Sequence, residues 1–72
     1  MKNNVHVVPS DGGWDVKVEG RRASRHFATQ REAIQAGRRL AQGNRAEHIV
    51  HGRDGQIRQR DSYGRDPFPP RG

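Results

Sequence analysis

Apolar and polar residues alternate with a period of two in the first quarter of the chain. Val5 and Val7 flank His6, and residues 14–19 alternate strictly between apolar and charged side chains. The turn-forming residues Ser-Asp-Gly-Gly at 10–13 separate the two segments. A period of two is typical of strands with one buried face, and a glycine-containing link between two such strands predicts a β-hairpin.

A third strand and a helix are predicted next. Gly-Arg-Arg at 20–22 forms a turn, and residues 24–28 form a short strand whose one large apolar residue is Phe27. Thr29 and Glu32 have the spacing of a capping box, which predicts a helix over residues 30–42.

The predicted helix has two distinct sides at 100° per residue. One side gathers small and apolar residues, namely Ala33, Ile34, Ala36, Gly37, Leu40 and Ala41. The opposite side gathers Arg31, Gln35, Arg38, Arg39 and Gln42. Alanine and glycine on the first side would let the helix lie close to a sheet. Gly43 and Asn44 are predicted to end the helix.

The remaining segments predict a second hairpin and a tail. Residues 47–51 form a fourth strand, residues 52–55 a tight turn, and residues 56–60 a fifth strand with Ile57 as its apolar residue. The segment 63–72 is rich in proline and glycine, which predicts an extended or disordered tail. The fold class is therefore α+β in the order β-β-β-α-β-β, a small antiparallel sheet with one helix on one face.

The length of 72 residues and the hydrophobic content of 29% allow one modest core. We therefore expect a single compact domain over residues 1–62. Tyr63 is expected to dock on its open end, whereas Phe68 suits a disordered tail or a partner contact equally well. The predicted core residues are Val5, Val7, Val8, Trp14, Val16, Val18, Phe27, Ile34, Leu40, Ile49, Val50 and Ile57.

Composition and charge limit the classes of location and partner. The chain has no cysteine, no apolar run of membrane-spanning length, and no signal-peptide pattern near Met1, so we expect a cytoplasmic protein without membrane contact. Lysine and arginine number 14 against 8 acidic residues, a formal net charge of +6. This excess favours a polyanionic partner such as duplex DNA, although a solvated basic surface would look the same in the sequence.

Two groups of basic residues are candidates for binding nucleic acid. The first is expected on or next to the sheet face opposite Trp14, Val16 and Val18, and comprises Lys17, Arg21, Arg22 and Arg25. The second lies on the last hairpin, with Arg58 and Arg60 expected opposite Ile57, and comprises Arg53, Arg58 and Arg60. Trp14 and Phe27 belong to the core face, which disfavours a platform for stacking single-stranded bases.

Catalytic and metal chemistry find little support. The four histidines have no cysteine beside them, and His48 and His51 would point to opposite faces of one strand. We expect these histidines at surface or edge positions. Ser10, Ser24 and Ser62 lack the setting of a nucleophile elbow, and no glycine-rich phosphate loop follows a strand. We therefore expect no enzyme activity, no cofactor and no metal.

Five short motifs are distributed along the whole chain. They are His6-Val7-Val8-Pro9, Gly13-Trp14-x-Val16, Thr29-x-x-Glu32-Ala33, Val50-His51-Gly52-Arg53-Asp54-Gly55-x-Ile57 and Asp61-Ser62-Tyr63-Gly64-x-Asp66-Pro67. In these motifs the chain resembles a bacterial family of short uncharacterised proteins known as domain of unknown function 2188. The resemblance implies a compact domain and brings no established catalytic role.

A second resemblance covers residues 13–41 and is carried by Trp14-x-Val16-x-Val18-x-Gly20-Arg21-Arg22 and Phe27-x-Thr29-x-x-Glu32-Ala33. This segment resembles the arm-type DNA-binding domain of tyrosine recombinases. Those domains lay a three-stranded sheet in the major groove, which by analogy would turn the first basic group toward DNA.

These observations leave two hypotheses of different classes. The first is a non-enzymatic module that binds double-stranded nucleic acid with low specificity, as the net charge indicates. The second is a protein-interaction or homodimerisation module that pairs through an exposed sheet edge, as the small core indicates.

Overall fold

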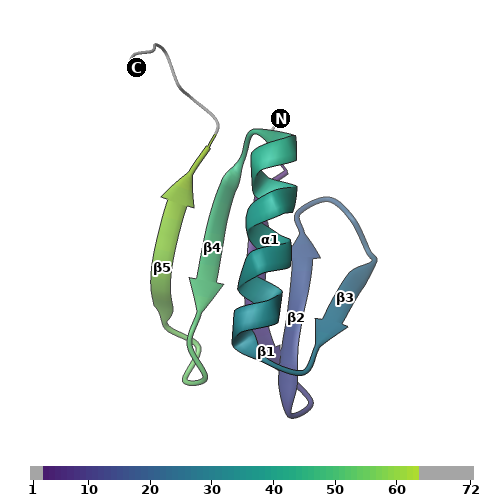
Figure 1. Cartoon of the computed structure of the whole chain (residues 1–72), viewed down its shortest axis with the longest axis vertical. Coiled ribbons are helices and arrows are strands. Elements are labelled where there is room, and N and C mark those ends of the chain that lie inside the picture. Colours follow the sequence, from purple (N-terminus) through teal and green to yellow (C-terminus); the bar gives the residue numbers. More distant parts are fainter. Residues whose placement is uncertain (1–2, 64–72) are drawn as a thin grey trace.

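In the computed structural model, which describes residues 3–63, helix α1 lies across one face of a five-stranded sheet (Figure 1). The opposite face carries no other described element. The elements are β1 (Val5–Ser10), β2 (Gly13–Val18), β3 (Ser24–Phe27), α1 (Gln30–Asn44), β4 (Glu47–His51) and β5 (Ile57–Ser62). The predicted order of elements is confirmed, while β3 is one residue shorter and β5 begins and ends later than predicted.

The strands are arranged in the order β3-β2-β1-β4-β5. Neighbours are antiparallel except for β1 and β4, which run parallel. The sheet is therefore mixed. The sequence had suggested a wholly antiparallel sheet, and that part of the prediction is wrong. The helix explains the difference, because it carries the chain back along the sheet so that β4 starts at the same end as β1.

The β1–β2 hairpin follows from its turn residues. Asp11 and Gly12 have φ angles of 40° and 77°, the two positive values that a two-residue type I′ turn requires. Pro9 is tolerated in this central strand because the pairing of β4 with β1 spans Val5 to Val7 and ends before it.

Helix α1 begins as predicted and ends later than predicted. The Thr29 hydroxyl accepts a hydrogen bond from the Glu32 amide at 3.2 Å. Gly43 is helical, and Arg45 takes the left-handed conformation at the end with a φ of 54°. The Ala46 amide then donates to the Ala41 carbonyl at 2.9 Å. This Schellman arrangement satisfies the last carbonyls of the helix without the glycine that usually occupies the position.

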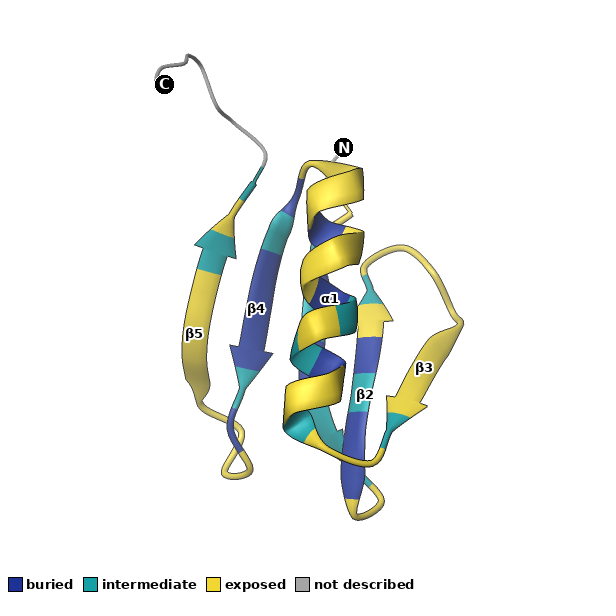
Figure 2. Ribbon diagram, in the orientation of Figure 1, coloured by how far each residue is buried: buried dark blue, intermediate teal, exposed yellow. Residues whose placement is uncertain are grey.

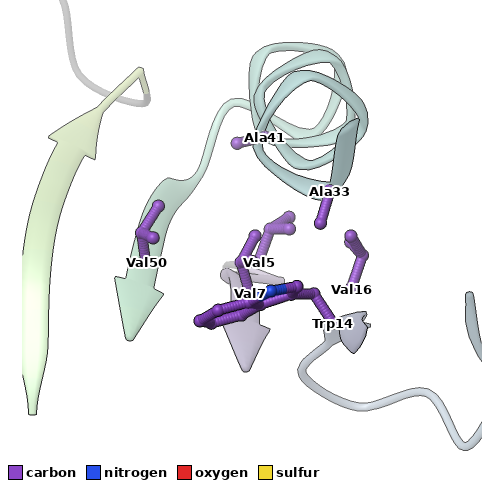
Figure 3. Close-up of a cluster of buried hydrophobic side chains, with 7 residues drawn as sticks. All are labelled: Val5, Val7, Trp14, Val16, Ala33, Ala41 and Val50. Carbon is purple, nitrogen blue, oxygen red and sulfur yellow. The ribbon is translucent and has the colours of Figure 1, made fainter. Parts of the chain in front are cut away.

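The core lies between α1 and the covered face of the sheet (Figure 3). Its buried members are Val5, Val7, Trp14, Val16, Ala33, Ala41 and Val50. Half-buried Val18, Phe27, Ile34 and Ala36 pack around them, together with Tyr63, so the predicted docking of Tyr63 is confirmed. Residues 64–72, including Phe68, lie outside the described residues.

Two predicted core residues are exposed. Leu40 is 38% exposed and Ile57 is 53% exposed. Leu40 lies at the margin of the narrow helix stripe, and Ile57 lies on an edge strand. Ile49 is buried on the face that α1 does not cover, since its partner in β1 is His6. Figure 2 shows the resulting contrast between buried β4 and exposed β5.

Candidate nucleic-acid interface

The strand register separates the first group of basic residues. Lys17 pairs with His6 and Ser24 on the open face of the sheet, whereas Arg25 pairs with Val16 on the face that carries α1. The prediction that Lys17 and Arg25 share a face is wrong. The signal was available in the sequence, because Arg25 stands two residues before Phe27 and a strand repeats every two residues.

Arg21 and Arg22 lie in the loop between β2 and β3 and are exposed. This loop is at the same end of the molecule as the carboxyl end of α1 (Figure 1). Contacts from the chain start to both segments support that placement: the Asn44 side chain donates to the Asn3 carbonyl at 3.5 Å, and the Glu19 amide donates to the Asn4 carbonyl at 2.9 Å.

The basic residues of the last hairpin are also divided. Ile57 pairs with His51 and Arg60 pairs with Ile49, so Ile57 and Arg60 share the open face. The register shifts near Val50 and His51, which breaks simple alternation along β5. The expected placement of Arg60 opposite Ile57 is therefore wrong.

Arg53 and Arg58 gather at the other end of the molecule from Arg21 and Arg22. The guanidinium carbon of Arg53 lies 5.4 Å from the centre of the Trp14 ring, which is within cation–π distance. Arg58 and Arg53 line the same hollow as Trp14 and Gln30. Both arginines are exposed.

The open face of the sheet uses histidines to engage its carboxylates. His6 Nε2 lies 2.8 Å from Glu19 Oε2, and the other ring nitrogen of His6 lies 3.2 Å from His51 Nε2. The rings of His6 and His51 stack with centres 5.4 Å apart. These contacts link β4, β1 and the end of β2 across the sheet, and sequence reasoning missed them because each joins residues from different strands.

A second pair lies nearer the β3 edge of the open face. His26 Nδ1 is 2.7 Å from Asp15 Oδ1. The hydrogen bond from His26 holds the pKa of Asp15 below its usual value, against the opposing effect of burial, and a hydrogen bond from Ser10 acts in the same direction. On β4 and β5, Arg60 Nε lies 3.6 Å from Glu47 Oε1. Acidic and basic groups are therefore interleaved across this face.

The helix side has a different charge pattern. Arg31, Arg38 and Arg39 are exposed on the outer surface of α1, and Arg45 follows at its carboxyl end. Glu32 is the acidic residue of the first turn. Within residues 3–63, Arg60 is the one arginine that lies within ion-pair distance of a carboxylate. The exposed arginines of the helix side therefore form no ion pair with a described carboxylate, although Glu32 lines the same hollow as Arg39.

His48 is the histidine whose position departs furthest from expectation. It is fully buried between β4 and α1, and neither ring nitrogen has a hydrogen-bond partner among the described residues. Burial lowers its pKa from the ordinary value. The prediction of surface or edge positions is wrong for this residue, whereas the prediction that His48 and His51 face opposite ways is confirmed by the pairing of β1 with β4.

No cluster suited to a metal ion occurs among the described histidines and acidic residues. In the same part of the chain, α1 is too short and too polar to cross a membrane.

Comparisons with known proteins place the chain in a family. The model of a family described as "uncharacterized protein conserved in bacteria (DUF2188)" matches residues 5–63. The uncharacterized protein YdaT of Bacillus subtilis (strain 168) is 35% identical over 65 residues, which cover 89% of this chain and 43% of that relative. The chain thus spans less than half the length of the curated relative, and no solved structure matches. The chain belongs to the bacterial DUF2188 family of uncharacterised proteins.

Proposed function

We propose that this domain is a non-enzymatic module that binds duplex DNA with low sequence specificity through its helix side. The observation that carries the proposal is the difference in charge between the two sides of the sheet. The open face interleaves Asp15, Glu19 and Glu47 with its basic groups. The outer surface of α1 and the β2–β3 loop present exposed arginines without such partners.

Such arginines are suited to binding phosphate groups. A guanidinium group donates hydrogen bonds in a planar fork that matches phosphate oxygens. Binding of several phosphates releases condensed counterions, so affinity falls steeply as salt rises. Phosphate contacts position a protein on the duplex without selecting a sequence. The expected activity is therefore salt-sensitive binding that varies little between sequences.

The recombinase analogy would instead place DNA against the open sheet face. Arg25 lies on the other side of the sheet, and the open face carries the carboxylates of Asp15 and Glu19. The helix side is therefore the better candidate surface.

Binding of a labelled random-sequence duplex at low and moderate salt tests the proposal. The test variant is Arg39→Glu on the outer surface of α1, and the matched control is Lys17→Glu on the open face, which changes the charge by the same amount. Arg39→Glu should weaken binding and lower the salt dependence by about one counterion. Lys17→Glu should have a smaller effect. Absence of binding at low salt would refute the function, and equal effects of the two variants would refute the surface.

An NMR titration with the same duplex adds a map of the interface. Salt-sensitive shifts are expected for backbone amides of the β2–β3 loop and of α1. The double variant Arg21→Glu with Arg22→Glu should weaken binding to all sequences alike, because phosphate contacts carry no sequence information. Shifts confined to β1 and β4 would place the ligand on the open face instead.

A second candidate function is pairing with a protein through the β5 edge. Ile57 on this edge strand is 53% exposed, and β5 has a strand partner on one side in β4. An unpaired strand edge offers backbone groups to a strand of another chain. Sedimentation at several protein concentrations tests the homodimeric form, which a concentration-independent monomer would exclude.

A further inference from the structure

A hollow of about 280 Å³ opens at the end of the molecule opposite the β2–β3 loop. Three elements meet there, namely the start of β2, the start of α1 and the β4–β5 turn (Figure 1). Its lining residues are Trp14, Gln30, Gly52, Arg53 and Arg58. Two of these five lining residues are arginines, Arg53 from the β4–β5 turn and Arg58 from β5. They are the charged residues of the lining, and both are positive.

The β4–β5 turn holds its backbone in a defined shape. The Gly52 amide donates to the Gln56 carbonyl at 2.7 Å, and the Gly55 amide donates to the Gly52 carbonyl at 2.9 Å. Gly55 has a φ of 89°, a conformation that favours glycine. These bonds fix the points from which the side chains of Arg53 and Arg58 leave the backbone.

Each arginine is also positioned by a contact of its own side chain. A methyl group at Gly52 would come within 2.7 Å of Arg58 Nε, so Arg58 lies over the bare backbone of that glycine. The guanidinium of Arg53 lies over the ring of Trp14, 5.4 Å from its centre. Trp14 is itself 4% exposed and packed in the core. The two guanidinium groups are therefore partly held in place before any ligand arrives.

Neither arginine of this pair forms an ion pair with a described carboxylate. Asp54 is the acidic residue of the turn, and its Oδ1 accepts the Gln56 amide at 3.1 Å. Asp54 makes no ion pair with Arg53 or Arg58, but it is close to Arg58: a methyl group at Gly52 would lie 3.1 Å from Asp54 Oδ1 and 2.7 Å from Arg58 Nε. The Asp54 carboxylate therefore offsets part of the charge of Arg58 and leaves that of Arg53 unpaired. Two like charges at one hollow repel each other, and a multivalent anion between them would remove that repulsion.

We propose that this hollow, the Arg53–Arg58 pocket, binds a phosphate group. Phosphate offers several oxygens to two guanidinium forks at once, whereas a single carboxylate is matched by one fork. The Gln30 carboxamide adds a further donor at the rim. The pocket offers no aromatic face for stacking a base, because Trp14 is almost wholly buried and the Arg53 guanidinium lies over its ring. The inference rests on these residues alone and holds whether or not the domain binds duplex DNA.

Inorganic phosphate is the direct probe of the pocket. It is titrated into the labelled full chain and followed by NMR, with sodium chloride at equal ionic strength as the reference. Saturable shifts are expected for the amides of residues 30, 52, 53 and 58 and for the Trp14 indole, with phosphate and not with chloride. Equal shifts at arginines throughout the chain would show general screening and overturn the proposal.

Paired variants separate the pocket from the rest of the basic surface. Arg53→Gln with Arg58→Gln should weaken phosphate binding about tenfold or more, since both forks are lost. Lys17→Gln with Arg60→Gln removes the same charge on the open face, outside both proposed binding surfaces, and should leave phosphate affinity unchanged. Gly52→Ala provides a third variant, because it displaces Arg58 while keeping both charges, and it should also weaken binding. Phosphate affinity that survives the first variant would refute the pocket.

Duplex binding by the same variants identifies where the phosphate comes from. If Arg53→Gln with Arg58→Gln lowers the salt dependence of duplex binding by about two counterions, the pocket holds a backbone phosphate. If duplex binding is unchanged or absent while inorganic phosphate still binds the unmodified chain, the pocket serves a free phosphate or a small phosphate ester. A failure to bind duplex DNA would therefore refute the proposed function but would leave phosphate binding by the pocket to be tested by the phosphate titration.

Discussion

The two faces of the sheet bury their residues by different means. On the covered face, valines of β1, β2 and β4 meet the alanines of α1 and are almost wholly buried. On the open face, Ile49 is buried beside polar neighbours that include His6, Glu47 and Arg60, and the polar groups are linked as histidine–carboxylate and arginine–carboxylate pairs. The covered face supplies most of the hydrophobic stabilisation. The polar pairs of the open face are partly exposed to solvent, and each contributes little.

The comparison also bears on the proposed binding surface. Three carboxylates of the open face, Asp15, Glu19 and Glu47, have basic partners, whereas the exposed arginines of α1 form no ion pair with a described carboxylate. A ligand of opposite charge would gain more from the side whose arginines lack partners. Substitutions at nearby positions of one strand or helix can compare the side that packs in the core with the side that does not.

Neighbouring valines in β1 should show the largest difference. Val7 is fully buried against α1, and Val8 is half-buried on the open face. Val7→Ala should lower the free energy of unfolding by about 2 to 3 kcal/mol, because it loses buried apolar surface and leaves a cavity. Val8→Ala should cost less than about 1 kcal/mol. Urea denaturation measures both, and similar losses would mean that the open face is covered in solution.

Two glycines of α1 give the next largest difference. A methyl group at Gly37 would lie 2.7 Å from His48 Nε2 and 3.1 Å from Val7 Cγ2, whereas nothing lies within 4 Å of one at Gly43. Gly37→Ala should destabilise the protein by about 1 to 2 kcal/mol, since overpacking outweighs the gain in helix propensity. Gly43→Ala should stabilise it by about 0.5 to 1 kcal/mol. A stabilising Gly37→Ala would show that α1 sits farther from the sheet.

The pH dependence of stability should give a smaller and graded effect. Burial lowers the pKa of His48 in the folded protein, so the unfolded chain binds more protons just below the ordinary histidine pKa of 6.5. Stability should therefore fall as the pH drops below about 6.5, by at most about 1.4 kcal/mol per pH unit for one proton. Asp61 on β5 opposes this shift, and Arg38 on α1 reinforces it.

Thermal denaturation between about pH 7.5 and about pH 5.5 measures the effect. His48→Leu should flatten the profile over this range, and His26→Gln on the open face is the matched control. A profile that remains equally steep in His48→Leu would assign the dependence to another group. In Asp15, by contrast, the lowered pKa contributes stability that is lost only as the pH falls below the ordinary carboxyl range, near 3.8.

Several features of the candidate sites could be predicted because they depend on local pattern. The period of two placed Trp14 and Val16 on the covered face, and the spacing of Thr29 and Glu32 located the start of α1. The exposed arginines of α1 also followed from helical periodicity. The positions that were misjudged, such as Arg25 and Arg60, depend on how one strand aligns with another.

By itself, the sequence determined the number, type and order of the elements, the hairpin turn at Asp11 and Gly12, and the excess of basic charge. These depend on backbone sterics and side-chain periodicity within one segment. Only the tertiary structure decided the parallel pairing of β1 with β4, the burial of His48 beneath Gly37, and the meeting of Arg53 and Arg58 at the Trp14 end of the sheet. Each of these joins residues far apart in the chain, and such contacts are selected by packing of the whole domain.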